Sequence, residues 1–96
     1  MATKNNFIPI TPEWQKCEDI TGAPVFEADK SYIIQAIGGY GYTLLCQATA
    51  KPEAGYAGGL RIANDASNSA TYKHETGYDL YVKTTGTNAS INIQEA

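Results

Sequence analysis

The amino-acid sequence predicts a small all-β domain: an antiparallel β-sandwich or jelly-roll-like barrel of roughly six to eight short strands with an extended N-terminal arm. Residues 78–84 and 89–94 alternate apolar and polar side chains, which is the pattern of half-buried strands. Glycine, proline and asparagine turn residues recur about every 8–12 positions. No window sustains an apolar period of about 3.6 residues beyond two turns, so we expect helices to be absent or one turn long.

A chain of 96 residues corresponds to one domain. Residues 1–6 are mostly polar, and the apolar residues 7–10 that follow are interrupted by Pro9. We therefore expect residues 1–10 to form an arm and residues 11–96 to form a single β-sandwich domain.

The expected strands follow one another at short intervals. Residues 31–37 and 42–48 are rich in β-branched and aromatic side chains without strict alternation, so we expect central strands covered on both faces. Residues 38–41 form the turn between them, where glycine permits a positive φ. The remaining expectations are strands at 14–20, 60–63, 70–74, 78–84 and 89–94, an irregular loop at 51–59, and a hairpin turn at 85–88 that pairs the last two strands.

Composition excludes several classes of function. The net charge is -3 and no two Lys or Arg residues are adjacent, which disfavours nucleic-acid binding. No apolar run approaches the ~18 residues of a membrane span, and the first residues lack the apolar block of a secretory signal. Cys17 and Cys46 lack CxxC spacing, so zinc and thioredoxin-like chemistry are not indicated. A disulfide remains one alternative, and two free, buried thiols are the other, which we expect in the absence of a signal.

Catalytic and cofactor motifs are not evident. His74 stands at the end of an expected strand, and no spacing identifies a nucleophile beside it. The carboxylate pairs Glu18/Asp19 and Glu27/Asp29 resemble solvated turn residues. The loop 64–68 offers one carboxylate for calcium, and residues 38–41 lack the GxGxxG pattern of a phosphate loop. We expect a protein that is not an enzyme and binds no cofactor or metal.

Tyrosine is abundant, with seven residues in the chain. A tyrosine at a glycine-rich loop or turn offers a rigid apolar face with a polar end, which suits contact with a partner. We expect Tyr40 and Tyr56 to be exposed contact residues and assign Tyr42 and Tyr78 to the sheet.

A series of short patterns carries a family resemblance. These are Trp14 followed by Ile20-Thr21-Gly22, the strand Lys30 to Gln35, Gly38-Gly39, the Pro/Gly-rich loop from Pro52 to Gly59, Leu80-Tyr81-Val82 and the closing Ile91-Asn92-Ile93-Gln94-Glu95. In this order the chain resembles small β-sandwich virion proteins of tailed bacteriophages, of the capsid decoration, cement or head and tail fibre-base type.

The resemblance implies a virion structural protein, assembled in the bacterial cytoplasm, that contacts the major capsid protein or another virion protein and is present as a homo-oligomer or in many copies. The arm, through Phe7, Ile8 and Ile10 together with Trp14, would carry one interface, since arms can add to a neighbour's sheet edge. Tyr40 and Tyr56 would carry another. The alternatives are a tail or fibre component and a carbohydrate- or host-receptor-binding module in which Tyr40, Tyr42 and Tyr56 form one strip for sugar rings.

Overall fold

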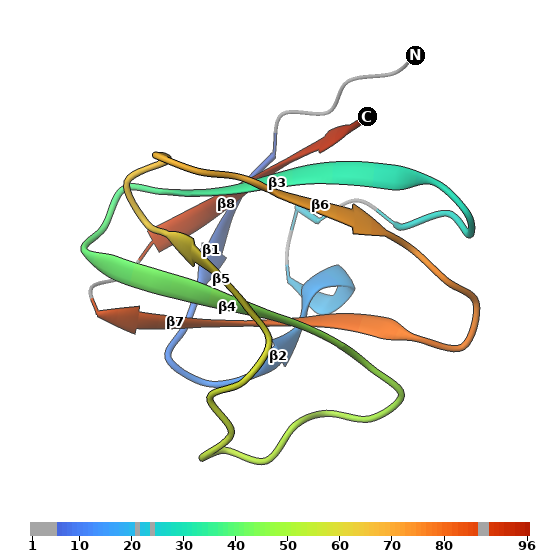
Figure 1. Ribbon diagram of the computed structural model, residues 1–96, viewed down its shortest axis with the longest axis horizontal. Coiled ribbons are helices and arrows are strands. Elements are labelled where there is room, and N and C mark those ends of the chain that lie inside the picture. The colour runs from blue at the N-terminus through green and yellow to red at the C-terminus, as the bar shows by residue number, and fades with distance from the viewer. Residues whose placement is uncertain (1–5, 21, 24, 87–88) are drawn as a thin grey trace.

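The computed structural model describes residues 6–20, 22–23, 25–86 and 89–96. Two four-stranded antiparallel sheets pack face to face, as Figure 1 shows, so the predicted small β-sandwich is confirmed. The first sheet has the order β1-β8-β3-β6 and the second β2-β7-β4-β5. The elements are β1 (Asn6–Ile10), β2 (Gln15–Lys16), a 3-10 helix η1 (Cys17–Asp19), β3 (Ser31–Ile37), β4 (Gly41–Ala48), β5 (Leu60–Ala63), β6 (Ala70–Lys73), β7 (Asp79–Gly86) and β8 (Ala89–Glu95).

The strand pairing is that of a jelly roll. First and last strands pair, β1 with β8, and the pairs β2 with β7, β3 with β6 and β4 with β5 continue inward along the chain. The pairs β3–β8 and β4–β7 complete the two sheets. A jelly roll is a double-sheet sandwich of eight strands that contains two Greek keys.

This topology corrects one prediction about turns. Strands β7 and β8 belong to opposite sheets, so the last two strands do not form the expected hairpin. Residues 87–88 of that predicted turn lie outside the described residues. Strands β3 and β4 are central in their sheets, as expected, but they too lie in different sheets, so residues 38–41 form a corner between the sheets. Alternation shows which side chains face inward and does not show which strand lies alongside.

The predicted N-terminal arm is wrong for residues 6–10. These residues form the edge strand β1 of the domain itself, with Asn6 opposite Ile93 and Ile10 opposite Ala89. Residues 1–5 lie outside the described residues. The strand expected at 14–20 is reduced to the two residues of β2, because the chain turns into η1 at Cys17.

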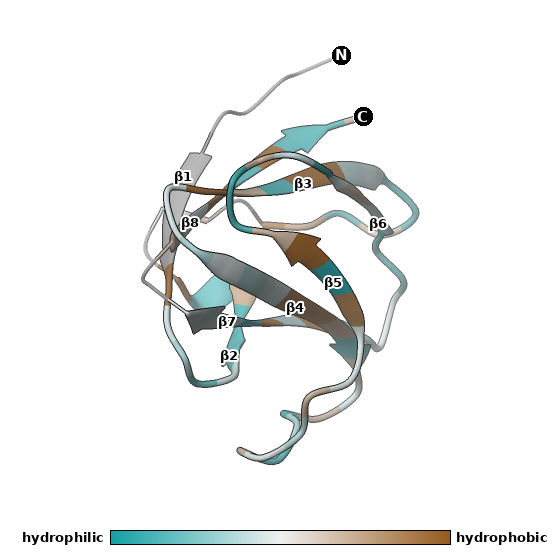
Figure 2. Ribbon diagram, turned by 60° about the vertical axis from the view of Figure 1, so that its left-hand side comes forward, coloured by the Kyte–Doolittle hydropathy of each residue, from teal (hydrophilic) through white to brown (hydrophobic). Residues whose placement is uncertain are grey.

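The space between the sheets is filled by alternating side chains. Every second residue of β8 (Ala89, Ile91 and Ile93) is buried, and so are Tyr32, Ile34 and Ala36 of β3. Figure 2 shows hydrophobic positions recurring along β3 and β5. The expectation of strands covered on both faces is confirmed for the middle of β4, where residues 43–45 are all buried. It is wrong for β3, because the outward-facing Ile33 is 37% exposed.

Candidate functional site

The outer face of the second sheet carries its own apolar cluster. Leu44 of β4 and Tyr81 of β7 point away from the sandwich interior and are buried together with Trp14. Half-buried Tyr42, Cys46 and Ala48 pack around them. We call these six residues the outer cluster. An apolar outer face in so small a domain requires a cover, and the chain supplies part of it from the loop 49–59.

The loop 49–59 is fastened to the outer cluster by Trp14 and Lys83. The Trp14 indole Nε1 donates a hydrogen bond to the carbonyl of Tyr56 at 2.9 Å. The Lys83 ammonium donates to the carbonyls of Ala54 at 3.0 Å and Tyr56 at 3.4 Å. The rings of Trp14 and Tyr56 lie 6.0 Å apart. A loop without regular structure is thus held at several points, which limits its conformational freedom.

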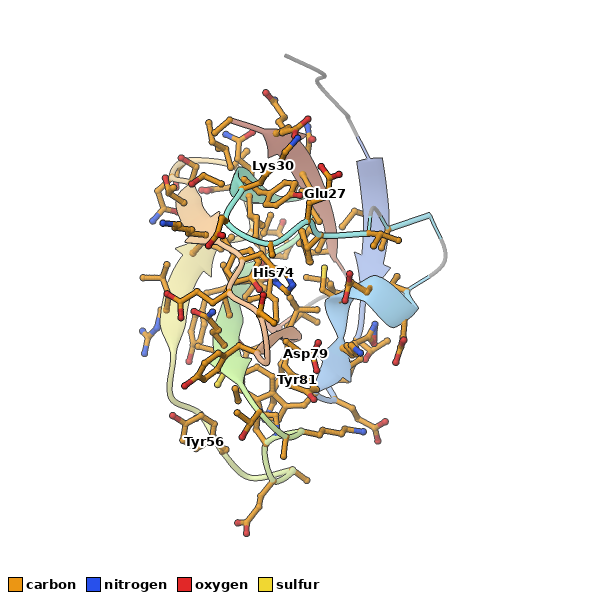
Figure 3. All side chains as sticks on the ribbon, turned by 90° about the vertical axis from the view of Figure 1, so that its right-hand side faces the viewer. Glu27, Lys30, Tyr56, His74, Asp79 and Tyr81 are labelled. Carbon is orange, nitrogen blue, oxygen red and sulfur yellow. The ribbon has the colours of Figure 1, made fainter. Side chains whose placement is uncertain are left out.

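Glycine is required where this loop rejoins the sheet. Gly59 adopts a φ of 99°, and a Cβ atom there would collide with the carbonyl of Leu45. Figure 3 shows the resulting position of Tyr56, on the loop beyond the end of β4 and away from Tyr81. Tyr56 is 47% exposed, so the prediction that it lies at the surface is confirmed.

A cavity of about 380 Å³ lies between the loop and the end of β4. Its walls are mainly apolar and are formed by Cys46, Gln47, Ala48, Ala50, Pro52, Glu53 and Tyr56. We call it the loop pocket. Its size falls at the lower end of the range of about 300–1,000 Å³ that is usual for binding pockets.

The turn at residues 38–41 is fixed by Asn64, whose side chain is fully buried. Its Nδ2 donates to the carbonyl of Tyr40 at 2.9 Å and to the Thr84 hydroxyl at 3.1 Å. Its Oδ1 accepts a hydrogen bond from the Thr43 hydroxyl at 2.6 Å. The Asn64 backbone also donates to the carbonyl of Gly41 at 3.0 Å and accepts from Gly39 at 3.3 Å. One buried amide therefore ties the turn to two strands of the second sheet.

Gly41 is needed at the end of this turn. Its φ is 82°, and a Cβ atom would meet the backbone of Thr85 on β7. Tyr40, just before it, is 81% exposed, so its predicted exposure is also confirmed. Beside it lies a cavity of about 350 Å³ formed by Gly38, Gly39, Tyr40, Asn64 and Asp65, which we call the turn pocket.

Two of the residues expected to contact a partner are buried. Ile10 and Trp14 are each 2% exposed, because Ile10 belongs to the interior core and Trp14 to the outer cluster. The prediction that they contact a partner is wrong. The backbone of Phe7 and Ile8 pairs with β8, and their side chains lie outside the described part of the chain.

The three tyrosines of the sugar-binding alternative do not form one strip. Tyr40 lies in the turn just before β4, whereas Tyr56 lies on the loop 49–59 that follows β4, with its ring 6.0 Å from the ring of Trp14 in the outer cluster. The Arg61 guanidinium lies 4.1 Å from the centre of the Tyr42 ring and covers one of its faces. The half-buried Tyr42 ring is therefore not available to stack on a sugar together with Tyr40 and Tyr56. Tyr78, which was assigned to the sheet, lies just before β7 and is 42% exposed.

The charged and titratable candidates have structural partners. His74 Nδ1 lies 2.6 Å from the Tyr72 hydroxyl, and the rings of both residues pack near Phe26. The Glu18 carboxylate accepts the Phe26 N–H at 2.9 Å. No group of three or more His, Cys, Asp or Glu side chains that could hold a metal occurs in residues 6–20, 22–23, 25–86 and 89–96.

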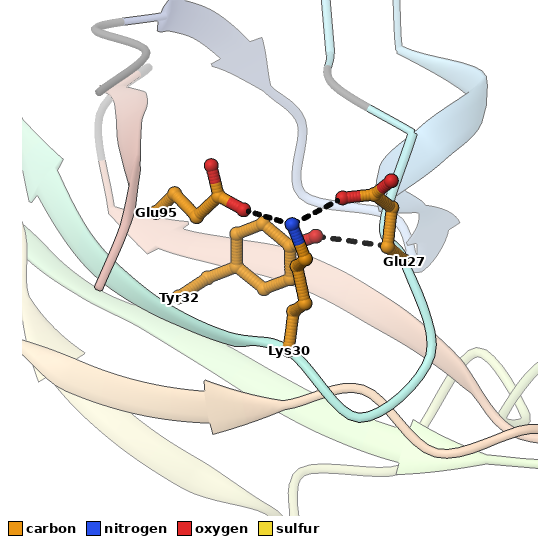
Figure 4. Close-up of polar contacts among 4 residues, drawn as sticks. All are labelled: Glu27, Lys30, Tyr32 and Glu95. Carbon is orange, nitrogen blue, oxygen red and sulfur yellow. Dashed lines mark hydrogen bonds and ion pairs between the residues drawn. The ribbon is translucent and has the colours of Figure 1, made fainter. Parts of the chain in front are cut away.

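An ion-pair network joins the segment before β3 to the C-terminal strand. Lys30 Nζ lies 3.0 Å from Glu27 and 3.0 Å from Glu95, as Figure 4 shows. Hydrogen bonds to Glu27 and Glu95 raise the pKa of Lys30. The hydroxyl of Tyr32 accepts the Glu27 N–H at 2.8 Å. Together with the hydrogen bond from the Phe26 N–H to Glu18, these contacts position the segment 25–30.

Both cysteines are free. Cys17 is buried, as expected, whereas Cys46 is half-buried. Cys17 belongs to the interior core and Cys46 packs on the outer cluster, so a layer of sheet separates them. Burial raises the pKa of the Cys17 thiol to about 12 and also raises the pKa of Cys46.

The sequence did not indicate that several apolar residues are exposed or that Asn64 holds the turn at residues 38–41 in place. Val25 is 77% exposed and Leu60 is 53% exposed, although both side chains are apolar. Asn64 was considered only as a calcium ligand, yet its side-chain oxygen accepts a hydrogen bond from the Thr43 hydroxyl. Asparagine within a polar loop carries no pattern that distinguishes a buried support from a surface residue.

The chain matches no known family model, and no curated protein or solved structure is significantly similar to it. In the described residues, no helix has the length and apolar character needed to cross a membrane.

Proposed function

We propose that this protein is a non-enzymatic structural component of a bacteriophage virion, a capsid decoration or cement subunit that stabilises the shell through contacts with the major capsid protein. The observation that carries the proposal is the jelly-roll order of the eight strands. This architecture is shared by viral capsid and lectin domains and by cupins. Because one architecture serves several functions, the resemblance to small phage virion proteins selects among them.

The docking surface in this proposal is the loop 49–59 with its loop pocket. Tyr56 is half exposed on a loop that Trp14 and Lys83 already hold in place. A contact residue that is ordered before binding loses less conformational entropy when it binds. The pocket beside it can receive an apolar side chain of the shell protein, since Ala48, Ala50 and Pro52 form its wall. This surface replaces the arm, since residues 6–10 form the edge strand β1 of the domain itself.

The test uses particles of a phage that encodes the chain, prepared without it, to which purified protein is added. The wild-type chain should co-sediment with the particles at a saturating stoichiometry. Tyr56→Ser and Ala50→Arg should each weaken binding at least tenfold, about 1.4 kcal/mol, by removing the contact ring or filling the pocket. Tyr78→Ser is the matched control, since Tyr78 is comparably exposed but lies outside the loop.

Saturable binding that is lost in the two loop variants and kept in the control would support the proposal. Particles that never bind the wild-type chain would refute the virion role. Binding that survives both loop variants would refute the loop as the docking surface.

A further inference from the structure

The turn pocket lies apart from the proposed docking surface. Its residues 38–40 belong to the connection before β4, at the left of Figure 1, whereas the loop 49–59 follows β4 and lies at the bottom. A subunit bound through the loop would therefore keep the turn pocket away from the docking contact. The residues of the turn pocket combine an aromatic ring, a carboxylate and glycine backbone. The turn requires glycine at Gly38, where φ is 91°, but neither the fold nor the proposed docking role requires the Tyr40 ring beside the Asp65 carboxylate.

Rigidity is the first property that distinguishes this pocket. Asn64 holds the turn through its buried side chain and its backbone. On the other wall, the Ala66 N–H donates to the Ala36 carbonyl at 2.9 Å, and Ala66 adopts a φ of 64°, which costs a residue with a Cβ atom about 1 kcal/mol. Both loops that form the pocket are thus fixed in position before any ligand arrives, which reduces the entropy lost on binding.

Chemistry is the second property. Tyr40 presents its ring at 81% exposure. An aromatic face of this kind packs against the C–H groups of a ring-shaped ligand. The Asp65 carboxylate accepts the Ser67 N–H through Oδ1 at 3.0 Å, and hydrogen bonds from Ser67 lower its pKa, so it is ionised at neutral pH. A carboxylate accepts about four hydrogen bonds, so acceptor positions remain for hydroxyl groups. Gly38 has no atom within 4 Å of the place a Cβ would occupy, which leaves its backbone approachable.

We propose that the turn pocket binds one neutral pyranose unit of a glycan, with the Tyr40 ring against its C–H face and the Asp65 carboxylate accepting its hydroxyl hydrogens. A neutral sugar fits better than an acidic one, because Asp65 and the net charge of -3 would repel a second carboxylate. The cavity of about 350 Å³ is large enough for a small ligand. The site would give a particle-bound subunit an outward contact with cell-surface sugar.

The experiment is an NMR titration of the isolated, ¹⁵N-labelled chain. The probes are methyl β-D-galactopyranoside, methyl β-D-glucopyranoside and N-acetyl-D-glucosamine, with D-glucuronic acid as the charged comparison. We expect at least one neutral sugar to cause saturable shifts confined to residues 38–41 and 64–66, with a Kd of about 1–10 mM. Glucuronic acid should bind at least about fivefold more weakly.

Three variants identify the contacts. Tyr40→Ala should weaken binding at least tenfold, about 1.4 kcal/mol, whereas Tyr40→Phe should stay within about threefold because the ring face is kept. Asp65→Asn should weaken binding of neutral sugars by about fivefold and remove the discrimination against glucuronic acid. Tyr56→Ala removes an exposed tyrosine from the other surface and should leave sugar binding unchanged.

The proposal would be overturned if no neutral sugar gave saturable shifts, if the shifts mapped to the loop 49–59, or if Tyr40→Ala bound as well as the wild type. Loss of particle binding in Tyr40→Ala without any sugar binding would identify the turn as a protein contact and would equally overturn it. The titration contains no particles, so its result is independent of the virion role.

Discussion

Replacing Asn64 with alanine should lower the free energy of unfolding by about 3 kcal/mol. The side chain makes three hydrogen bonds, to Thr43, Thr84 and the Tyr40 carbonyl. Thr43 and Thr84 are 0% and 1% exposed, so both hydroxyls would lose their partner in the interior of the protein. Each buried polar group left without a partner costs about 1–3 kcal/mol, and the lower figure applies here because a hydroxyl can rotate. The loss is a large share of the roughly 5–10 kcal/mol expected for a domain of this size.

Urea unfolding followed by the fluorescence of Trp14, the single tryptophan, measures this change. The matched control is Asn68→Ala, which removes one exposed hydrogen bond to the Ala63 N–H and should cost less than about 1 kcal/mol. In a double-mutant cycle, Asn64→Ala and Thr84→Val should couple by at least about 0.5 kcal/mol, since they share a hydrogen bond. A loss below about 1 kcal/mol for Asn64→Ala, or strict additivity with Thr84→Val, would refute the supporting role of Asn64.

Three further outcomes follow from the same contacts. The raised pKa of the Cys17 thiol, about 12, means that the folded state holds its proton more tightly than the unfolded chain, whose thiol titrates near 9.0. The free energy of unfolding should therefore fall by up to about 1.4 kcal/mol per pH unit above pH 9, and Cys17→Ala should reduce this slope. An unchanged slope in Cys17→Ala would contradict the raised pKa of this thiol. Ile10→Ala should lower the free energy of unfolding by about 2–4 kcal/mol, whereas Val25→Ala should lower it by under about 0.5 kcal/mol. Equal small losses in urea unfolding would contradict the burial of Ile10 and favour the predicted arm. Trp14→Phe removes the hydrogen bond to the Tyr56 carbonyl and should speed cleavage after Glu53 by a glutamate-specific protease; a wild-type cleavage rate would show that Trp14 does not hold the loop.

The sequence correctly predicted those features that depend on neighbouring residues within one strand or turn. The alternation in β8 correctly predicted that Ala89, Ile91 and Ile93 face inward, and β5 and the turn at 38–41 lie where they were expected. These features depend on local chemistry: period-two burial in a strand, and glycine where φ must be positive.

The sequence did not predict which strands pair, because strand pairing depends on segments that lie far apart along the chain. The residues between β7 and β8 are suitable for a hairpin turn, but these two strands belong to different sheets. Residues 6–10 resembled an arm because Pro9 interrupts them, yet proline is tolerated in an edge strand such as β1. Trp14 gave no sign of burial, since the outer cluster that covers it comes from β4 and β7.

The candidate site was predicted in part. Tyr40 and Tyr56 were expected at the surface from their glycine neighbours alone, and both are exposed. The residues that fix them, Asn64 for the turn and Trp14 and Lys83 for the loop, act over separations of more than 20 residues along the chain. No short-range pattern could have identified them.

A cryo-electron microscopy map of particles carrying the chain tests the central claim most directly. We expect a jelly-roll density on the outer surface of the shell, with the loop 49–59 against the major capsid protein and the turn at residues 38–41 facing solvent. Particles without this density, or subunits attached through the turn with Tyr56 facing outward, would contradict it.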